Sequence, residues 1–104
     1  LIIANSRQYG ARLDPARSAR TDDALLDVVF MPARTRLDLV RWAARLLAGA
    51  HLDHPSVLSQ TATSVEVNCL DGAFPVQIDG ECAGQETQLS CRIAPGALNA
   101  LRAR

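Results

Sequence analysis

The sequence predicts a mostly β domain of the α+β class, an antiparallel β-sandwich that carries one crossover α-helix. The segments 64–70, 74–78 and 87–93 alternate apolar and polar residues, which is the pattern of half-buried strands. Residues 25–31 form a short apolar run rich in β-branched residues, as in a strand buried on both faces. Apolar residues recur at helical spacing between Leu37 and Leu47. With 104 residues the chain is long enough for one domain.

The first quarter of the chain predicts a strand, a long loop and a second strand. Ile2-Ile3-Ala4 fits the end of a strand, and the polar residues 5–23, which include Gly10 and Pro15, indicate a loop. A loop of that length in a small domain is usually functional. The apolar run that follows is ended by Pro32, which has no N–H to give to a sheet.

The helix has clear start and stop signals. Thr35 is a favourable N-cap, and Asp38 adds a negative charge to the first turn. Gly49 favours the left-handed conformation that ends a helix. The apolar residues between Leu37 and Leu47 predict a broad face that packs on the rest of the domain. The loop 51–55 follows.

Turn signals separate the strands of the second half. Asp71-Gly72 is the strongest hairpin signal and predicts that the strands on either side of it pair. Asp79-Gly80 is a second signal of the same kind. Because residues 81–86 are poor strand formers and include Gly84, we place the chain turn near Gly84-Gln85. Pro95-Gly96 marks a further turn before a short terminal element at 97–101.

Charge and cysteine usage exclude several function classes. Eleven basic and eleven acidic residues give no net charge, which argues against non-specific nucleic-acid binding. All the basic residues are arginine, a bias typical of GC-rich coding, with phosphate binding as the alternative. The spacing of the three cysteines fits neither a disulfide framework nor a zinc site, and indicates reduced thiols in the cytosol. No apolar run is long enough to span a membrane.

The triplet Asp79-Gly80-Glu81 is the strongest candidate for chemistry. In an extended chain the two carboxylates point the same way, two residues apart. Such a pair can hold magnesium, or one member can act as a base while the other positions it. The alternative is that Asp79-Gly80 forms a hairpin turn.

Other candidates carry structural alternatives. Adjacent carboxylates in 21–24 could bind a hard cation or could form a solvated Asx turn. His51 and His54 could ligate a metal or orient a phosphate, or could simply pack within their loop. Trp42 could anchor an interface or a lipid surface, or could lie at the core edge. Cys82 has no base nearby in the sequence that would activate a nucleophile.

Six segments together resemble the C-terminal half of the diacylglycerol kinase catalytic-domain family, which includes bacterial soluble diacylglycerol kinases and the sphingosine and ceramide kinases. The similar segments run in order over nearly the whole chain. They are Asn5 with Tyr9-Gly10, the run 21–29, the helix Leu37–Leu47, the loop 49–57, the run Pro75–Glu81, and the run Ile93–Leu98.

The resemblance implies that residues 1–104 are the later part of the C-terminal β-sandwich domain of an ATP-dependent lipid kinase, with the N-terminal nucleotide-binding domain outside this chain. Asp79 would be the general base and Glu81 would orient it or help to organise Mg²⁺. The side chain of Asp23, with the carbonyls of Arg20 and Leu25, would hold a structural Mg²⁺. The family has Gly where this chain has Ala24, so a positive φ there would be strained.

The same resemblance implies a cytoplasmic protein that contacts the inner membrane surface peripherally and acts on a diacylglycerol-like lipid, with ATP as co-substrate and no nucleic-acid partner. This chain alone would then be inactive. Two alternatives stay open: a sphingoid-base kinase, and a non-catalytic module that binds a lipid or another protein. Exposed edge strands could also pair two copies into a homodimer.

Overall fold

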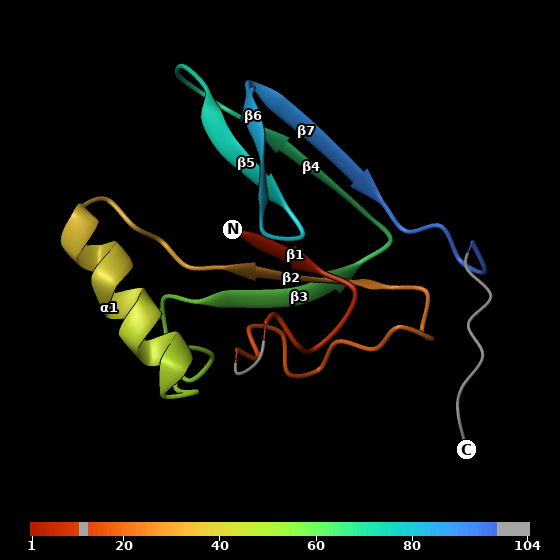
Figure 1. Cartoon of the computed structure of the whole chain (residues 1–104), viewed down its shortest axis with the longest axis horizontal. Helices are drawn as coiled ribbons and strands as arrows, with labels where there is room; N and C mark the ends of the chain where they lie inside the picture. Colours follow the sequence, from red (N-terminus) through yellow and green to blue (C-terminus); the bar gives the residue numbers. More distant parts are fainter. Residues whose placement is uncertain (11–12, 98–104) are drawn as a thin grey trace.

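The computed structural model describes residues 1–10 and 13–97 (Figure 1). The terminal element expected at 97–101 lies, apart from Ala97, outside this range. Strands and one helix follow one another as β1 (Ile2–Ala4), β2 (Leu26–Phe30), α1 (Arg36–Leu47), β3 (Leu58–Ala62), β4 (Ser64–Asn68), β5 (Phe74–Ile78), β6 (Glu81–Glu86) and β7 (Gln88–Arg92). Every strand pair is antiparallel, so the predicted mostly β class with one helix is confirmed.

The first sheet has the order β1-β2-β3 and forms the base of the domain (Figure 1). β2 is its central strand, with Ile3 opposite Val28 on one side and Gln60 opposite Val28 on the other. Four of the five residues of β2 are buried, as the apolar run predicts. The sequence did not signal β3, because its residues Leu58–Ala62 are mostly polar and exposed. β3 forms because β2 offers an unpaired edge to it.

A small core lies against β2. Val29 is fully buried and packs with Ala16 and Ala19, and these two alanines belong to the long loop that precedes β2. The loop is therefore ordered by packing rather than by regular hydrogen bonding. His51 is also fully buried, and its Nε2 donates a hydrogen bond to the carbonyl oxygen of Pro15 at 2.9 Å. That bond ties the loop after the helix to the loop before β2.

The helix α1 begins and ends where the sequence predicts. The hydroxyl of Thr35 accepts the N–H of Asp38 at 3.2 Å, and the Asp38 carboxylate accepts the N–H of Thr35 at 2.9 Å, which completes a capping box. Gly49 follows the C-cap with a φ of 68°. The helix joins the antiparallel neighbours β2 and β3.

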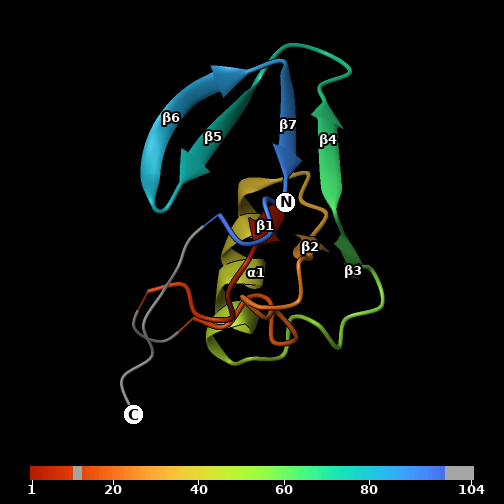
Figure 2. The same cartoon turned by 90° about the vertical axis from the view of Figure 1, so that its right-hand side faces the viewer.

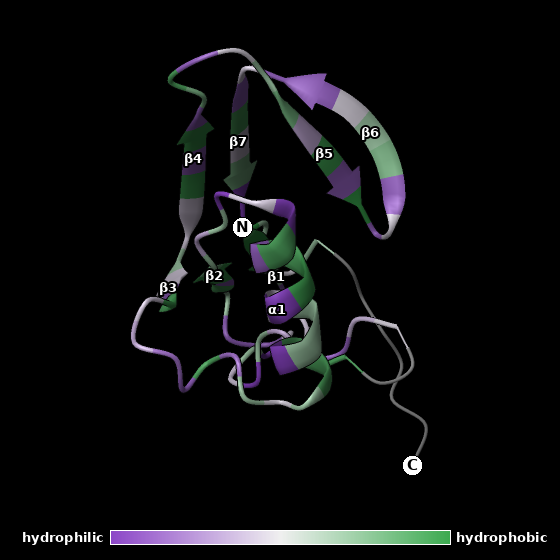
Figure 3. Ribbon diagram, turned by 90° about the vertical axis from the view of Figure 1, so that its left-hand side faces the viewer, coloured by the Kyte–Doolittle hydropathy of each residue, from purple (hydrophilic) through white to green (hydrophobic). Residues whose placement is uncertain are grey.

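The expected packing of the helix is wrong, because none of its residues is buried. Leu37, Leu39, Val40 and Leu47 are exposed, and Leu47 keeps 72% of its surface accessible. Only one edge of the helix meets the domain, through the half-buried Trp42 and Leu46. Figure 3 shows both apolar and polar residues along the outward side of the helix.

Two strand pairs stand above the base sheet, as Figure 2 shows. β4 pairs with β7, so that Val65 opposes Cys91 and Val67 opposes Leu89. Residues 65, 67, 89 and 91 are half-buried while their neighbours are exposed, which confirms the predicted alternation. One residue, Thr63, separates β3 from β4, and its carbonyl accepts the N–H of Ile93 at 3.0 Å.

The predicted hairpin at Asp71-Gly72 is wrong. β5 pairs with β6 rather than with β4, and the chain reverses at Asp79-Gly80. Residues 81–86 form a strand despite their low strand propensity, because the two-residue turn places them directly beside β5. The register shift between Val76 and Gln77 is a bulge, and Gly84 on the partner strand has a φ of 97°.

Candidate functional site

Asp79 and Gly80 are the two central residues of the β5–β6 turn. Their φ angles are 50° and 85°, and Ile78 pairs with Glu81 immediately outside them. Positive φ at both central residues is the requirement of a type I′ turn, and Asp-Gly is one of the dipeptides that satisfies it. The turn that we placed at Gly84-Gln85 is therefore at Asp79-Gly80. The strong local preference of this dipeptide outweighs the weak strand propensity of the residues that follow it.

The turn changes the expected relation between the two carboxylates. Asp79 lies in a left-handed conformation, so Asp79 and Glu81 are not two alternate residues of one extended strand. Glu81 opposes Ile78 in the ladder, and directly opposed residues project to the same face of a sheet. Both acidic residues are exposed. Glu81 thus shares a face with Ile78 rather than with Asp79.

A hollow of about 740 Å³ opens beside the turn, and Asp79 and Gly80 form part of its lining. β1, the loop that follows it, one edge of α1 and the end of β5 contribute the other walls. Most of the lining is apolar, and among the described residues that line it Asp79 is the only acidic one. The remaining lining residues are Leu1, Ile2, Ile3, Ala4, Asn5, Ser6, Gln8, Tyr9, Leu13, Pro15, Leu39, Leu46, Pro75 and Gln77.

The hollow brings together residues that are far apart in the sequence. Asn5 and Tyr9, which carry one segment of the family resemblance, line the same space as Asp79. The Tyr9 hydroxyl lies 3.2 Å from the point where a Cβ on residue 80 would stand, so the glycine allows close approach of the two segments. Leu39 and Leu46 belong to the apolar residues that predicted the helix, and their place in this wall was not predicted. The helical periodicity could only show that they share a face.

The loop 20–25 lies apart from this hollow, since none of its residues belongs to the lining. Asp23 Oδ1 accepts the N–H of Leu25 at 3.0 Å, which is an Asx turn. Arg20 donates to the Asp22 carboxylate from Nε at 3.1 Å, and this hydrogen bond raises the pKa of the Arg20 guanidinium. The loop therefore offers two kinds of oxygen ligand: the carboxylate of Asp23, which is not part of the Arg20–Asp22 pair, and main-chain carbonyls. An all-oxygen donor set of that kind suits a hard cation such as Mg²⁺.

Ala24 adopts a φ of 58°, which is the left-handed conformation that the resemblance implies for this position. An L-residue with a Cβ is strained there by roughly 1–2 kcal/mol. Ala24 is exposed, so the strain is not offset by burial of its methyl group. Within the part of the chain that the structure describes, no three His, Cys, Asp or Glu side chains gather as a metal site.

The other candidate residues all lie outside the lining of this hollow. They are His51, His54, Trp42 and Cys82. His51 is buried, as the structural alternative predicted, and His54 is half-buried, with its Nδ1 accepting the N–H of Ser56 at 3.2 Å. Trp42 is half-buried and donates from Nε1 to the Pro32 carbonyl at 2.7 Å. Cys82 is an exposed free thiol, and the three cysteines form no disulfide.

The fold and the hollow define a β-sandwich-like domain that presents one carboxylate at the rim of an apolar space. The chain belongs to the family described as the YegS C-terminal NAD kinase beta sandwich-like domain, whose model matches residues 1–102. It is 29% identical over 108 residues to proteins named diacylglycerol kinase from two strains of Mycobacterium tuberculosis, CDC 1551 / Oshkosh and ATCC 25618 / H37Rv. The match covers 98% of this chain and 32% of each relative, so the chain spans about a third of their length.

Among the described residues no helix is both long enough and apolar enough to cross a bilayer.

Proposed function

We propose that this chain is the C-terminal domain of an ATP-dependent lipid kinase and that it supplies the general base for phosphorylation of a diacylglycerol-like hydroxyl. The proposal rests on the position of Asp79, whose side chain is the only carboxylate that the described part of the chain contributes to the lining of the apolar hollow. Membership of the family and the similarity to two proteins named diacylglycerol kinase support it. The nucleotide would be bound mainly by a separate N-terminal domain, because the chain contains no glycine-rich phosphate-binding motif.

The proposed role of Asp79 follows from what phosphoryl transfer requires. The lipid hydroxyl oxygen attacks the γ-phosphorus of ATP. The bond between this phosphorus and the β,γ-bridging oxygen breaks, and ADP leaves. The Asp79 carboxylate takes the hydroxyl proton in that step and returns it to solvent, with which it is in contact. A positioned base of this kind contributes a factor of ~10²–10⁴ to the rate.

The apolar walls of the hollow suit a lipid substrate. Leu39 and Leu46 from the helix and Ile3 from β1 face this space, and they can contact the acyl chains near the reacting hydroxyl. Glu81 lies next to the turn and would act through Asp79 or through a metal, rather than by contact with the lipid.

The loop 20–25 fits a structural Mg²⁺, with the Asp23 carboxylate and the carbonyls of Arg20 and Leu25 as its ligands. When bound, such an ion would neutralise negative charge and fix the loop that leads into β2. Peripheral contact with a membrane follows from the lipid substrate and belongs to the proposal.

The test is transfer of labelled phosphate from ATP to diacylglycerol in mixed micelles with Mg²⁺, by a polypeptide that joins this domain to its nucleotide-binding domain. Asp79→Asn should lower turnover by about 10²-fold or more. The turn should survive, because Asn-Gly satisfies a type I′ turn as well as Asp-Gly does. Asp71→Asn is the matched control: it alters another Asp-Gly pair, one that lies outside the hollow.

Unchanged turnover in a folded Asp79→Asn variant would exclude Asp79 as the base. If the unmodified protein transfers no phosphate to diacylglycerol, a panel of sphingoid and glycerolipid acceptors separates a different acceptor from a domain without catalysis.

A further inference from the structure

A second hollow, of about 580 Å³, lies on another side of the helix and is lined mainly by basic and polar groups. Its walls come from the segment before the helix, the first three turns of the helix, and the loop before β3. Three arginines, Arg34, Arg41 and Arg45, contribute to it, against the single carboxylate of Asp38. The local balance is therefore two positive charges, on a chain whose net charge is zero.

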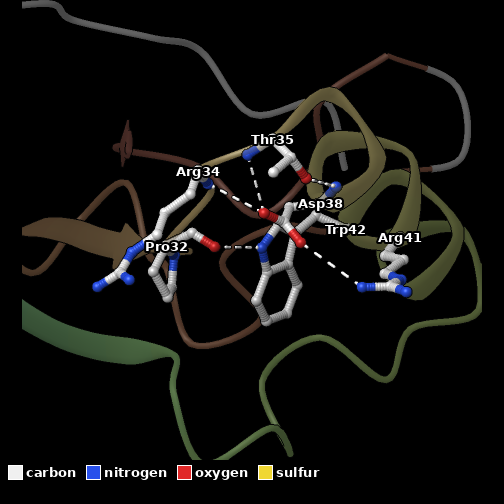
Figure 4. Close-up of polar contacts among 6 residues, drawn as sticks. All are labelled: Pro32, Arg34, Thr35, Asp38, Arg41 and Trp42. Carbon is white, nitrogen blue, oxygen red and sulfur yellow. Dashed lines mark hydrogen bonds and ion pairs between the residues drawn. The ribbon is translucent and has the colours of Figure 1, made fainter.

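The carboxylate in this hollow is already engaged. Asp38 Oδ2 accepts the N–H groups of Arg34 at 3.0 Å and Thr35 at 2.9 Å (Figure 4). Its Oδ1 lies 3.7 Å from Arg41 Nη1. At this distance the two groups form an ion pair but no hydrogen bond. The backbone N–H groups of Arg34 and Thr35 are the main causes that hold the pKa of Asp38 below its ordinary value.

Two of the three guanidinium groups, those of Arg34 and Arg45, have no side-chain hydrogen bond or ion pair to another described residue. Figure 4 shows the Arg34 and Arg41 side chains on opposite sides of the Trp42 ring. Arg41 and Arg45 are four residues apart and so lie on the same face of the helix, one turn above the other.

Side-chain contacts hold Trp42 and His54, which both line the hollow. The Trp42 indole donates to the Pro32 carbonyl at 2.7 Å and packs edge-on against His54, with ring centroids 5.0 Å apart. His54 Nδ1 lies 3.2 Å from the backbone nitrogen of Ser56 and 2.7 Å from its hydroxyl oxygen, so Ser56 holds the ring in place. Several guanidinium groups in one hollow match a doubly charged oxyanion such as a phosphate, because each planar guanidinium can donate two N–H groups to two of its oxygens.

We propose that this hollow is a binding site for a phosphate monoester dianion, separate from the hollow at Asp79. Arg34, Arg41 and Arg45 supply the charge, and Trp42 with His54 holds the shape of the site. The ligand is either a free phosphate compound or the phosphomonoester headgroup of a lipid, and the chemistry of recognition is the same for both. This proposal does not depend on the proposed kinase activity.

The first measurement is equilibrium dialysis of the protein against labelled inorganic phosphate at about pH 8, where the dianion predominates. Trp42 is the only tryptophan in the chain, so its fluorescence, followed in parallel, reports whether the ion binds at this hollow. We expect saturable binding that weakens as chloride is added, because salt screens the ionic contacts. Absence of saturable binding overturns the proposal.

Two matched double variants test whether phosphate binds in this hollow. Arg41→Gln/Arg45→Gln should weaken phosphate binding by about tenfold or more, since it removes two charged donors. Arg36→Gln/Arg92→Gln removes the same charge from an arginine on the same helix and from β7, both outside the hollow, and should leave binding unchanged. Equal weakening by both pairs, in variants with unchanged circular dichroism, would show non-specific charge attraction and overturn the proposal.

Two further arms identify the source of the phosphate. Vesicles of phosphatidylcholine with phosphatidic acid should bind the protein, and soluble glycerol 3-phosphate should compete, if a lipid headgroup is the ligand. Binding of inorganic phosphate and glycerol 3-phosphate without vesicle binding would support the same site for a soluble ligand. Vesicle binding that survives Arg41→Gln/Arg45→Gln would count against the headgroup as the ligand of this site.

Discussion

The Tyr9 hydroxyl lies over Gly80, 3.2 Å from the place that a Cβ on this glycine would occupy. Tyr9 belongs to the loop after β1, where it bridges to Leu13, and Gly80 belongs to the β5–β6 turn that carries Asp79. The contact closes one side of the apolar hollow. Residues that are 71 positions apart in the chain therefore set the surroundings of the proposed base.

This contact leads to a prediction about Gly80→Ala. Gly80 has a φ of 85°, so alanine there should lower the free energy of unfolding by roughly 1–2 kcal/mol. The crowding against Tyr9 should add little, because Tyr9 is half exposed and its side chain can move. Urea unfolding of Gly80→Ala, Tyr9→Phe and the double variant separates the cost of backbone strain from the cost of crowding against Tyr9. If Tyr9→Phe removed most of the loss, the contact rather than the backbone would dominate.

Ala24→Gly should stabilise the domain. Ala24 has a φ of 58° and is exposed, so glycine relieves the left-handed strain and gives up no packing. The greater freedom of glycine in the unfolded chain offsets part of the gain, which leaves about 0.5–1 kcal/mol. Thermal unfolding measures it. Ala48→Gly, at a residue with a φ of −76°, is the matched control and should not stabilise. A stability loss in Ala24→Gly would show that the turn is not strained.

Mg²⁺ should raise the melting temperature of the protein in a concentration-dependent way if the loop 20–25 holds the ion, because the ion binds only the folded loop. Asp23→Asn keeps an oxygen that can accept the Leu25 N–H but loses the charge, so the shift with Mg²⁺ should vanish. Asp22→Asn is the control, because Arg20 pairs with this carboxylate. If Mg²⁺ raised the melting temperature equally in the unmodified protein, Asp23→Asn and Asp22→Asn, the ion would bind somewhere other than this loop.

The capping box should make stability depend on pH through Asp38. Hydrogen bonds from the Arg34 and Thr35 N–H groups lower the pKa of Asp38 in the folded state below the ordinary 3.8. A lowered folded pKa gives stability that is present above the ordinary value and is lost as pH falls through the folded value. Asp38→Asn should therefore be less stable than the unmodified protein at about pH 7, and the difference should shrink below about pH 4.

Urea unfolding at several pH values measures this difference. Asp53→Asn, at an exposed residue with no hydrogen bond or ion pair to any described residue, is the control and should show no such trend. A constant difference between Asp38→Asn and the unmodified protein at all pH values would mean that the carboxylate charge does not contribute to the cap.

Local signals predicted the helix and most of the strands. Thr35, Asp38 and Gly49 act within a few residues of their own position, so the start and end of α1 could be inferred directly. The alternation in β4 and β7 and the apolar run of β2 identified these strands, because each pattern reports burial of one or both faces. Strand β3 carries no such pattern, since it is a mostly exposed edge.

The sequence by itself also identified Asp79 as a candidate site residue. The residue types alone determine that a carboxylate could act as a base and that arginines could bind a phosphate. Only the tertiary structure decided that Asp79-Gly80 is a turn, that β4 pairs with β7, and that Tyr9 lies over Gly80. Two Asp-Gly dipeptides offer the same local preference, and the choice between them depends on which strands meet. That choice is set by contacts between distant segments, which no local pattern contains. The two hollows arise in the same way, because each is lined by segments that the fold brings together.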